Sequence, residues 1–267
     1  MAIKLVAIDL DDTLLGDDLI ISEHCLNTIR AIQEKGVLVT LATGRMYSSA
    51  LPYARQLKMD IPIITYQGAL VKNSLSGEIL YYKPVPGVLA VKIMEYFEEN
   101  NVHYHAYFGD RLCMKSLTEE GKCYANLAGI EPVIMEDLIY KAKSQETFKI
   151  LSVTEDYGLL LEMELELKGM YGRELNITRS KPFFLETMNS LANKGDALQV
   201  VARHYNIERK EVLAIGDSYN DLQMIEWAGI GVAMGNARDT VKEAADYVTF
   251  SNEEEGVAEA LRKFVLN

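Results

Sequence analysis

Short apolar runs alternate with amphipathic segments in the first third of the chain. The apolar runs have strand length, and each is followed by polar residues. Ser22 suits the N-cap of the first helical segment, and Gly36 suits the position after its end. Strands that are mainly apolar and alternate with amphipathic helices predict a parallel sheet covered by helices on both faces. The predicted elements are strands over 3–10, 37–42 and 63–66, and helices over 22–35 and 47–58.

The same alternation returns after residue 187, where it predicts strands over 212–215 and 231–234 and helices over 194–205, 221–228, 239–245 and 254–265. Between 83 and 186, strands and helices follow one another without regular alternation, which is typical of an antiparallel α+β domain. The sequence therefore predicts an α/β core with a Rossmann-like parallel sheet, formed by residues 1–82 and 187–267. An α+β domain at 83–186 interrupts it.

The composition and net charge limit the kinds of ligand that this protein is expected to bind. Apolar residues make up 49% of the chain and charged residues 25%, which is ordinary for a globular protein. The net charge of -12 argues against a nucleic-acid binder, which normally carries a basic surface. A phosphorylated ligand would need local positive charge or a metal cation in its site, because the net negative charge of the protein repels it.

The cysteines and the hydropathy indicate a cytoplasmic protein. Cys25, Cys113 and Cys123 have no CxxC spacing, so reduced thiols are expected rather than disulfides or a zinc site. The apolar run at the N-terminus is too short for a signal peptide, and no stretch reaches the length of a transmembrane helix. We expect no membrane partner, and the oligomeric state is left open.

Reactive side chains follow the predicted strands. In open α/β sheets, ligands bind at the carboxyl ends of the strands. Four segments carry these side chains. Three directly follow a predicted strand, and the segment at 193–196 begins a predicted helix. They are Asp9-Leu10-Asp11-Asp12-Thr13, Ala42-Thr43-Gly44-Arg45, Asn193-Lys194-Gly195-Asp196 and Gly216-Asp217-Ser218-Tyr219-Asn220-Asp221. Each segment alone fits an ordinary turn or cap, but all four in this order argue against coincidence.

The converging charges predict a metal and a phosphoryl group in one site. The carboxylates of Asp9, Asp11 and Asp217 would repel one another and raise each other's pKa without a cation. Oxygen ligands of this kind suit Mg²⁺, which would also neutralise phosphate oxygens. Lys194 adds a positive charge, Thr43 adds a hydroxyl donor, and N–H groups at the following helix starts favour an anion.

These segments resemble the motifs of the haloacid dehalogenase-like (HAD) superfamily, specifically its Cof-type phosphatases with a type II (IIB-like) cap. The matching stretches are DLDDTLL at 9–15, LATGR at 41–45, NKGDAL at 193–198 and GDSYNDLQM at 216–224. The resemblance covers the whole chain, including an insertion of the right size between the second and third motifs. It departs from the family at Asp12, where many members have Gly, and at Gln67, where the family usually has Asn.

The resemblance implies a role for each matching residue. Asp9 attacks phosphorus and forms an aspartyl-phosphate, while Asp11 protonates the leaving oxygen and then activates water. Asp9, the backbone carbonyl of Asp11, and Asp217 hold Mg²⁺. Thr43 and Lys194 bind the transferring phosphoryl group, and Asn220 and Asp221 orient these groups. The residues expected to contact substrate are Thr43, Gly44, Arg45, Lys194 and Asn220.

The resulting hypothesis is a Mg²⁺-dependent phosphomonoester hydrolase that acts on a small phosphorylated metabolite. Sugar phosphates are the default by resemblance, with nucleotides, pyridoxal phosphate and FMN left open. Two alternatives remain, a phosphomutase of the same superfamily and a non-catalytic regulator that binds a phospho-ligand. The regulator is the weaker alternative, because a protein that only binds a phospho-ligand would not need the general acid and base Asp11. His103 and His105 would share one face of a strand, and an exposed or substrate-facing strand is preferred to a metal site there because a third ligand is missing.

Overall fold

The computed structural model describes residues 2–267, and the chain divides into two compact units. One consists of Met1–Tyr82 and Asn193–Asn267, and the other of Lys83–Ala192. The second boundary falls at 192/193 rather than at the expected 186/187. The reason is that the last strand of the inserted unit, β11 (Phe184–Asn189), pairs along its length with strands of that unit.

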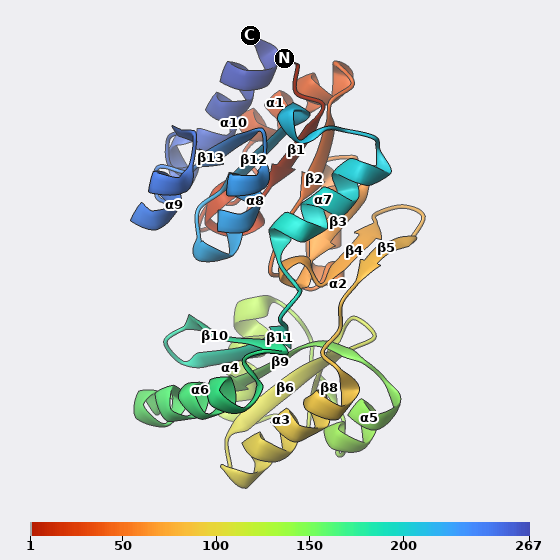
Figure 1. The fold of residues 1–267 in the computed structure, drawn as a ribbon, viewed down its shortest axis with the longest axis vertical. Coiled ribbons are helices and arrows are strands. Elements are labelled where there is room, and N and C mark those ends of the chain that lie inside the picture. Colours follow the sequence, from red (N-terminus) through yellow and green to blue (C-terminus); the bar gives the residue numbers. More distant parts are fainter. Residues whose placement is uncertain (1) are drawn as a thin grey trace. The chain divides into compact units, whose positions relative to one another are not determined.

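A parallel sheet forms the centre of the first unit (Figure 1). Its strands run in the order β14-β13-β12-β1-β2, and every neighbouring pair is parallel. All four residues of β1 are buried, because helices cover the sheet and leave no polar face. The strands are β1 (Leu5–Ile8), β2 (Leu38–Leu41), β12 (Val212–Gly216), β13 (Ile230–Ala233) and β14 (Tyr247–Val248).

The helices of this unit begin and end close to the positions that the sequence predicts. Ser22 caps the first helix, its Oγ accepting from the N–H of Cys25 at 3.0 Å, and Gly36 takes a φ of +83° just beyond the helix end. The first helix packs with the last, and α7 packs with α8. The helices are α1 (Glu23–Glu34), α2 (Tyr47–Gln56), α7 (Lys194–His204), α8 (Leu222–Trp227), α9 (Asp239–Ala244) and α10 (Gly256–Leu261).

The strand expected at 63–66 does not extend the parallel sheet as a full member. It forms β3 (Pro62–Thr65) of a separate antiparallel sheet with β4 (Leu70–Asn73) and β5 (Ile79–Tyr82), and a single parallel bridge, Ala42 to Ile64, links it to the first sheet. The cause is a tight turn in which Tyr66, Gln67 and Gly68 all have positive φ, so the chain reverses at once.

The inserted unit is built on a sheet with the order β10-β11-β9-β6-β7-β8, antiparallel except between β7 and β8. An apolar core that includes Phe97, Ile150, Leu160 and Leu185 lies between one face and the helices α3, α5 and α6. The remaining elements are β6 (His103–Phe108), β7 (Arg111–Met114), β8 (Val133–Ile134), β9 (Thr147–Val153), β10 (Leu175–Lys181), α3 (Gly87–Glu99), α4 (Glu119–Ala128), α5 (Leu138–Ser144) and α6 (Tyr157–Tyr171).

The expectation that His103 and His105 lie on an exposed strand is wrong, because both side chains are at least half-buried. His105 is fully buried, and its ring packs at a tilt against that of Tyr124 of α4, with the centroids 4.1 Å apart. The Nδ1 of His103 is hydrogen-bonded to the Oγ1 of Thr118, the N-cap of α4. Helix α4 covers this part of the sheet, which strand alternation alone does not reveal. Among residues 2–267, no metal-ligand cluster includes either histidine.

We expect His105 to make the protein sensitive to mild acid. Burial, and then the charges of His103 and Lys149, hold the pKa of His105 well below its usual value. The unfolded chain binds a proton near pH 6.5 that the folded chain resists, so stability should fall as the pH drops below about 6.5. Replacing His105→Phe should reduce the loss in urea midpoint between pH 7.5 and 5.5. The control is His204→Gln, at an exposed position. Equal pH dependence in wild type and His105→Phe would contradict the prediction.

Candidate active site

The first acidic segment leaves β1 at its carboxyl end. Asp9 has an extended backbone and is only 5% exposed, and the chain then makes a tight, irregular turn over Leu10–Leu14. Within that turn Asp12 has a φ of +58°, a conformation that favours glycine, the residue common here in the family that the motifs resemble. Because Ile8 of β1 pairs with Ile215 of β12, Asp9 lies at the edge of the sheet where both strands end.

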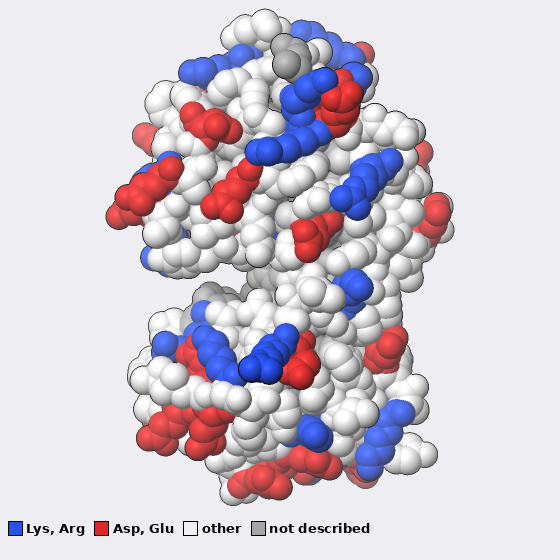
Figure 2. Space-filling view, in the orientation of Figure 1, with Lys and Arg blue, Asp and Glu red and all other residues white. Residues whose placement is uncertain are grey.

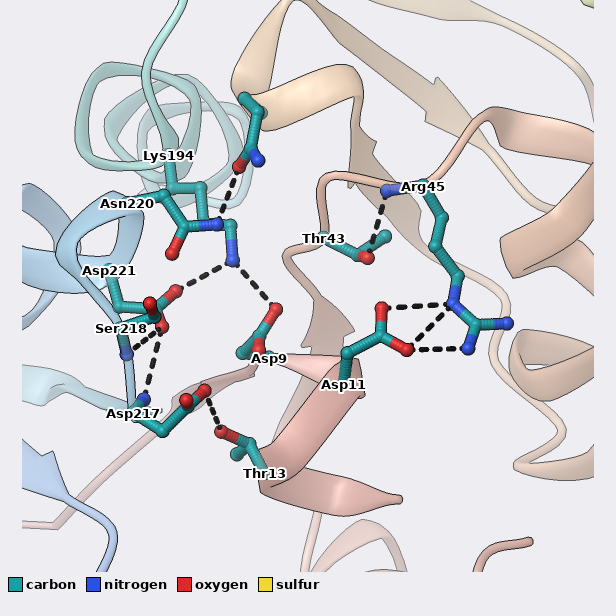
Figure 3. A network of polar contacts seen from close by, with 11 residues as sticks. Asp9, Asp11, Thr13, Thr43, Arg45, Lys194, Asp217, Ser218, Asn220 and Asp221 are labelled. Atoms are coloured by element: carbon teal, nitrogen blue, oxygen red, sulfur yellow. Dashed lines mark hydrogen bonds and ion pairs between the residues drawn. The ribbon is translucent and has the colours of Figure 1, made fainter. Parts of the chain in front are cut away.

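A buried ammonium group joins two of the acidic segments (Figure 3). The Nζ of Lys194 lies 2.6 Å from Asp9 Oδ1 and 2.6 Å from Asp221 Oδ1. Lys194 opens α7, whose N-cap Asn193 accepts from the N–H of Asp196 at 2.7 Å. Burial alone would lower the pKa of Lys194, but Asp221 and Asp9 outweigh burial and raise it, so this lysine stays charged.

The loop after β12 is organised by Asp221. Its Oδ2 accepts from the N–H groups of Asp217 and Ser218, at 3.0 Å each, and this carboxylate is fully buried. The neighbouring Asp217 accepts from the hydroxyl of Thr13 at 3.0 Å. Sequence reasoning did not single out Thr13, although it stands inside the DLDDTLL motif. This threonine ties the first acidic segment to the fourth.

Carboxylate oxygens of Asp9, Asp217 and Asp221 lie within 4.8 Å of one another. When ionised, these three carboxylates and the Lys194 ammonium sum to a charge of -2. Burial first, then Asp221, raises the pKa of Asp217 to about 6. Burial raises the pKa of Asp9 well above its usual value despite the opposing charge of Lys194. The cluster therefore fits a hard divalent cation, which would relieve this repulsion.

The side chain of Asp11 points to a different partner from the other acidic residues (Figure 3). Its two oxygens accept from Arg45 Nε at 3.0 and 2.9 Å, and Arg45 Nη2 lies 2.5 Å from Oδ1. The guanidinium of Arg45 also lies 5.3 Å from the ring centre of Tyr53. The structure thus pairs the two residues expected to serve as general acid and as substrate contact. Tyr53 was not singled out from the sequence.

The second motif supplies a buried hydroxyl next to this pair. Thr43 Oγ1 accepts from the N–H of Arg45 at 3.1 Å, which leaves its own hydrogen free to donate. Gly44 follows, and its close neighbour is the carboxamide of Gln67. Asn220 of the fourth motif donates through Nδ2 to Gln67 Oε1 at 2.8 Å. The candidate residues from all four motifs therefore gather at one edge of the parallel sheet.

Comparison with known proteins agrees with the motifs. The family of haloacid dehalogenase-like hydrolases matches residues 6–261. This chain belongs to that family. It is 33% identical to "Putative phosphatase YxeH" of Bacillus subtilis, over 98% of each chain. Among solved structures, it resembles a haloacid dehalogenase-like hydrolase from Bacteroides thetaiotaomicron, with 35% identity, a TM-score of 0.91, and coverage of 98% of this chain and 99% of that one.

A structure described as the "HAD Subclass IIB Sugar Phosphatase BT4131" is also similar, with 25% identity, a TM-score of 0.81 and coverage of 98% of each chain. The expected HAD fold, with its parallel-sheet core and α+β insertion, is confirmed by these neighbours and by the structure. The expected enzyme class, a phosphatase, is confirmed by the family match and these relatives. Within residues 2–267, no helix combines the length and apolar character needed to cross a bilayer.

Proposed function

We propose that this protein is a Mg²⁺-dependent phosphomonoester hydrolase that works through an aspartyl-phosphate on Asp9. The observation that supports this most strongly is the buried Lys194 ammonium, which contacts Asp9 and Asp221 while Asp217 lies beside them. A nucleophilic carboxylate, a fixed positive charge and a divalent-cation site are the groups that covalent phosphoryl transfer needs.

The carboxylates of Asp9 and Asp217 and the backbone carbonyl of Asp11 would hold Mg²⁺. Asp221 is a poor ligand, because one of its oxygens is bound to Lys194 and the other accepts two backbone N–H groups. Its proposed role is to orient Lys194 and the loop of Asp217. When bound, Mg²⁺ would supply positive charge to the oxygens of the transferring phosphoryl group.

The reaction follows in two steps. A carboxylate oxygen of Asp9 attacks phosphorus, the bond to the leaving oxygen breaks, and Asp11 gives that oxygen a proton. Water then attacks phosphorus, the bond between phosphorus and the Asp9 oxygen breaks, and Asp11 takes a proton from the water, which releases inorganic phosphate and restores the Asp9 carboxylate. Thr43 and Lys194 bind the phosphoryl group in both steps. Arg45, which binds Asp11 in this structure, would contact substrate only after that ion pair opens.

A small phosphorylated metabolite in the cytoplasm is the proposed substrate, with sugar phosphates as the first class to test. The similarity to a structure described as a sugar phosphatase supports this class. The inserted unit 83–192 is proposed to select among substrates, as its family resemblance implies. Three free cysteines, Cys25, Cys113 and Cys123, fit a reducing compartment.

Removal of the metal should abolish activity. We expect release of inorganic phosphate from p-nitrophenyl phosphate and from a panel of sugar phosphates to vanish in excess EDTA and to return when Mg²⁺ is added in excess over the chelator. Asp217→Asn should raise the Mg²⁺ concentration needed for half-maximal activity, because one charged ligand is lost. Undiminished phosphate release in EDTA would exclude the proposed metal site.

A further inference from the structure

Two carboxamides, those of Gln67 and Asn220, meet at the outer edge of the proposed phosphoryl site. They come from the turn after β3 and from the loop before α8, and they are joined by the 2.8 Å bond from Asn220 Nδ2 to Gln67 Oε1. Asp9, Thr43 and Lys194 are buried, whereas Gln67 is half-buried and Asn220 is exposed. The pair therefore forms the rim of this site, while the phosphoryl-binding groups form its floor.

The backbone at Gln67 is in a conformation that a glycine would adopt at lower cost. Its φ is +56°, and Gly68 next to it, with a φ of +96°, is pressed so closely on the start of α7 that an added Cβ would lie 2.1 Å from Asn193 O. The Gln67 carboxamide also needs the absence of a side chain at Gly44, where a Cβ would lie 2.4 Å from Gln67 Nε2. The turn at Gln67 and the space left by Gly44 together hold the Gln67 carboxamide at the edge of the site.

The bond between the two carboxamides leaves one nitrogen and one oxygen without a protein partner. Among residues 2–267, neither Gln67 Nε2 nor Asn220 Oδ1 has a hydrogen-bond partner. Exchanging the O and N atoms of both side chains gives the same result, one such nitrogen beside one such oxygen. A hydroxyl group, which both accepts and donates, complements such a pair, whereas a phosphate dianion can only accept.

We propose that Gln67 and Asn220 bind a hydroxyl group of the leaving group close to the phosphate ester, and so select phosphorylated polyols and sugars. The inference rests on the proposed phosphatase function and adds a specificity-determining residue, Gln67, to it. Because both residues belong to the core unit, this recognition is built into the phosphoryl site itself.

Two esters that differ in their hydroxyl groups test this inference on the Mg²⁺-loaded full chain. Glycerol 1-phosphate carries a hydroxyl on the neighbouring carbon, and propyl phosphate carries none. The test variant is Gln67→Met, which keeps the length of the side chain and removes its polar atoms. We expect the ratio of kcat/KM for the two esters to fall by about tenfold from wild type to Gln67→Met, with propyl phosphate changed by less than about threefold.

The matched control is Gln199→Met, the same change at a half-buried glutamine of α7, and it should leave the ratio as in wild type. Equal losses for both esters in Gln67→Met, or an unchanged ratio, would overturn the proposed hydroxyl contact and leave the hydrolase intact. If wild type releases no phosphate from these esters or from an aryl phosphate, the proposed function and this inference fail together.

Discussion

Replacing Asp9→Asn should lower kcat by roughly 10³ to 10⁶-fold, because the side chain keeps its shape and loses the attacking charge. The fold should survive. In the metal-free protein, burial and the neighbouring Asp221 and Asp217 raise the pKa of Asp9 well above its usual value, so the Asp9 carboxylate is unfavourable there. Lys194 keeps its second partner, Asp221, in the variant. We therefore expect the melting temperature in EDTA to be equal to or higher than that of wild type.

Two measurements on the same preparation separate chemistry from folding. Acid quench during turnover should trap phosphate covalently on wild type and none on Asp9→Asn. The control is Asp60→Asn, the same change at an exposed aspartate outside the site, which should behave as wild type in both measurements. A folded Asp9→Asn protein that keeps more than a few per cent of wild-type activity would remove Asp9 from the covalent role.

The sequence predicted those parts of the fold that depend on local signals. The buried strands β1, β2 and β12 are apolar except for Thr40 in β2, and the helix that starts after Ser22 has both of its end signals in the sequence. The separate sheet β3-β4-β5 was not predicted, since its turn uses positive φ at Tyr66 and Gln67, two residues that rarely mark a turn. Similarly, the burial of His105 depends on packing by α4, which no local pattern indicates.

The candidate site shows the same division. That Asp9, Lys194, Asp217 and Asp221 meet could be predicted, because strand ends and the start of α7 fix their positions. The direction in which a side chain points could not be predicted. Asp11 is only two residues from Asp9 in the sequence, yet its carboxylate forms an ion pair with Arg45 and does not join the acidic cluster. Side-chain rotation decides that contact, and only the structure reveals it.

Replacing Asp11→Asn should impair the enzyme to a degree that depends on the leaving group. An amide can still contact Arg45, but it cannot give a proton to the leaving oxygen or take one from water. A sugar alkoxide needs that proton as its bond breaks, whereas an acidic phenol needs it much less. We expect phosphorylation of Asp9 to slow by about 10² to 10⁴-fold with a sugar phosphate and by far less with p-nitrophenyl phosphate.

Hydrolysis of the aspartyl-phosphate is common to both substrates, so its slowing should make the intermediate accumulate when the aryl ester is used. Single-turnover measurements with acid quench would show both effects in one experiment. Asp12→Asn is the matched control, because it makes the same change at the neighbouring exposed aspartate, and it should leave the two phosphorylation rates in their wild-type ratio. Equal slowing of phosphorylation with both substrates, and no trapped intermediate, would mean that the Asp11 side chain supports the structure around Arg45 and moves no proton.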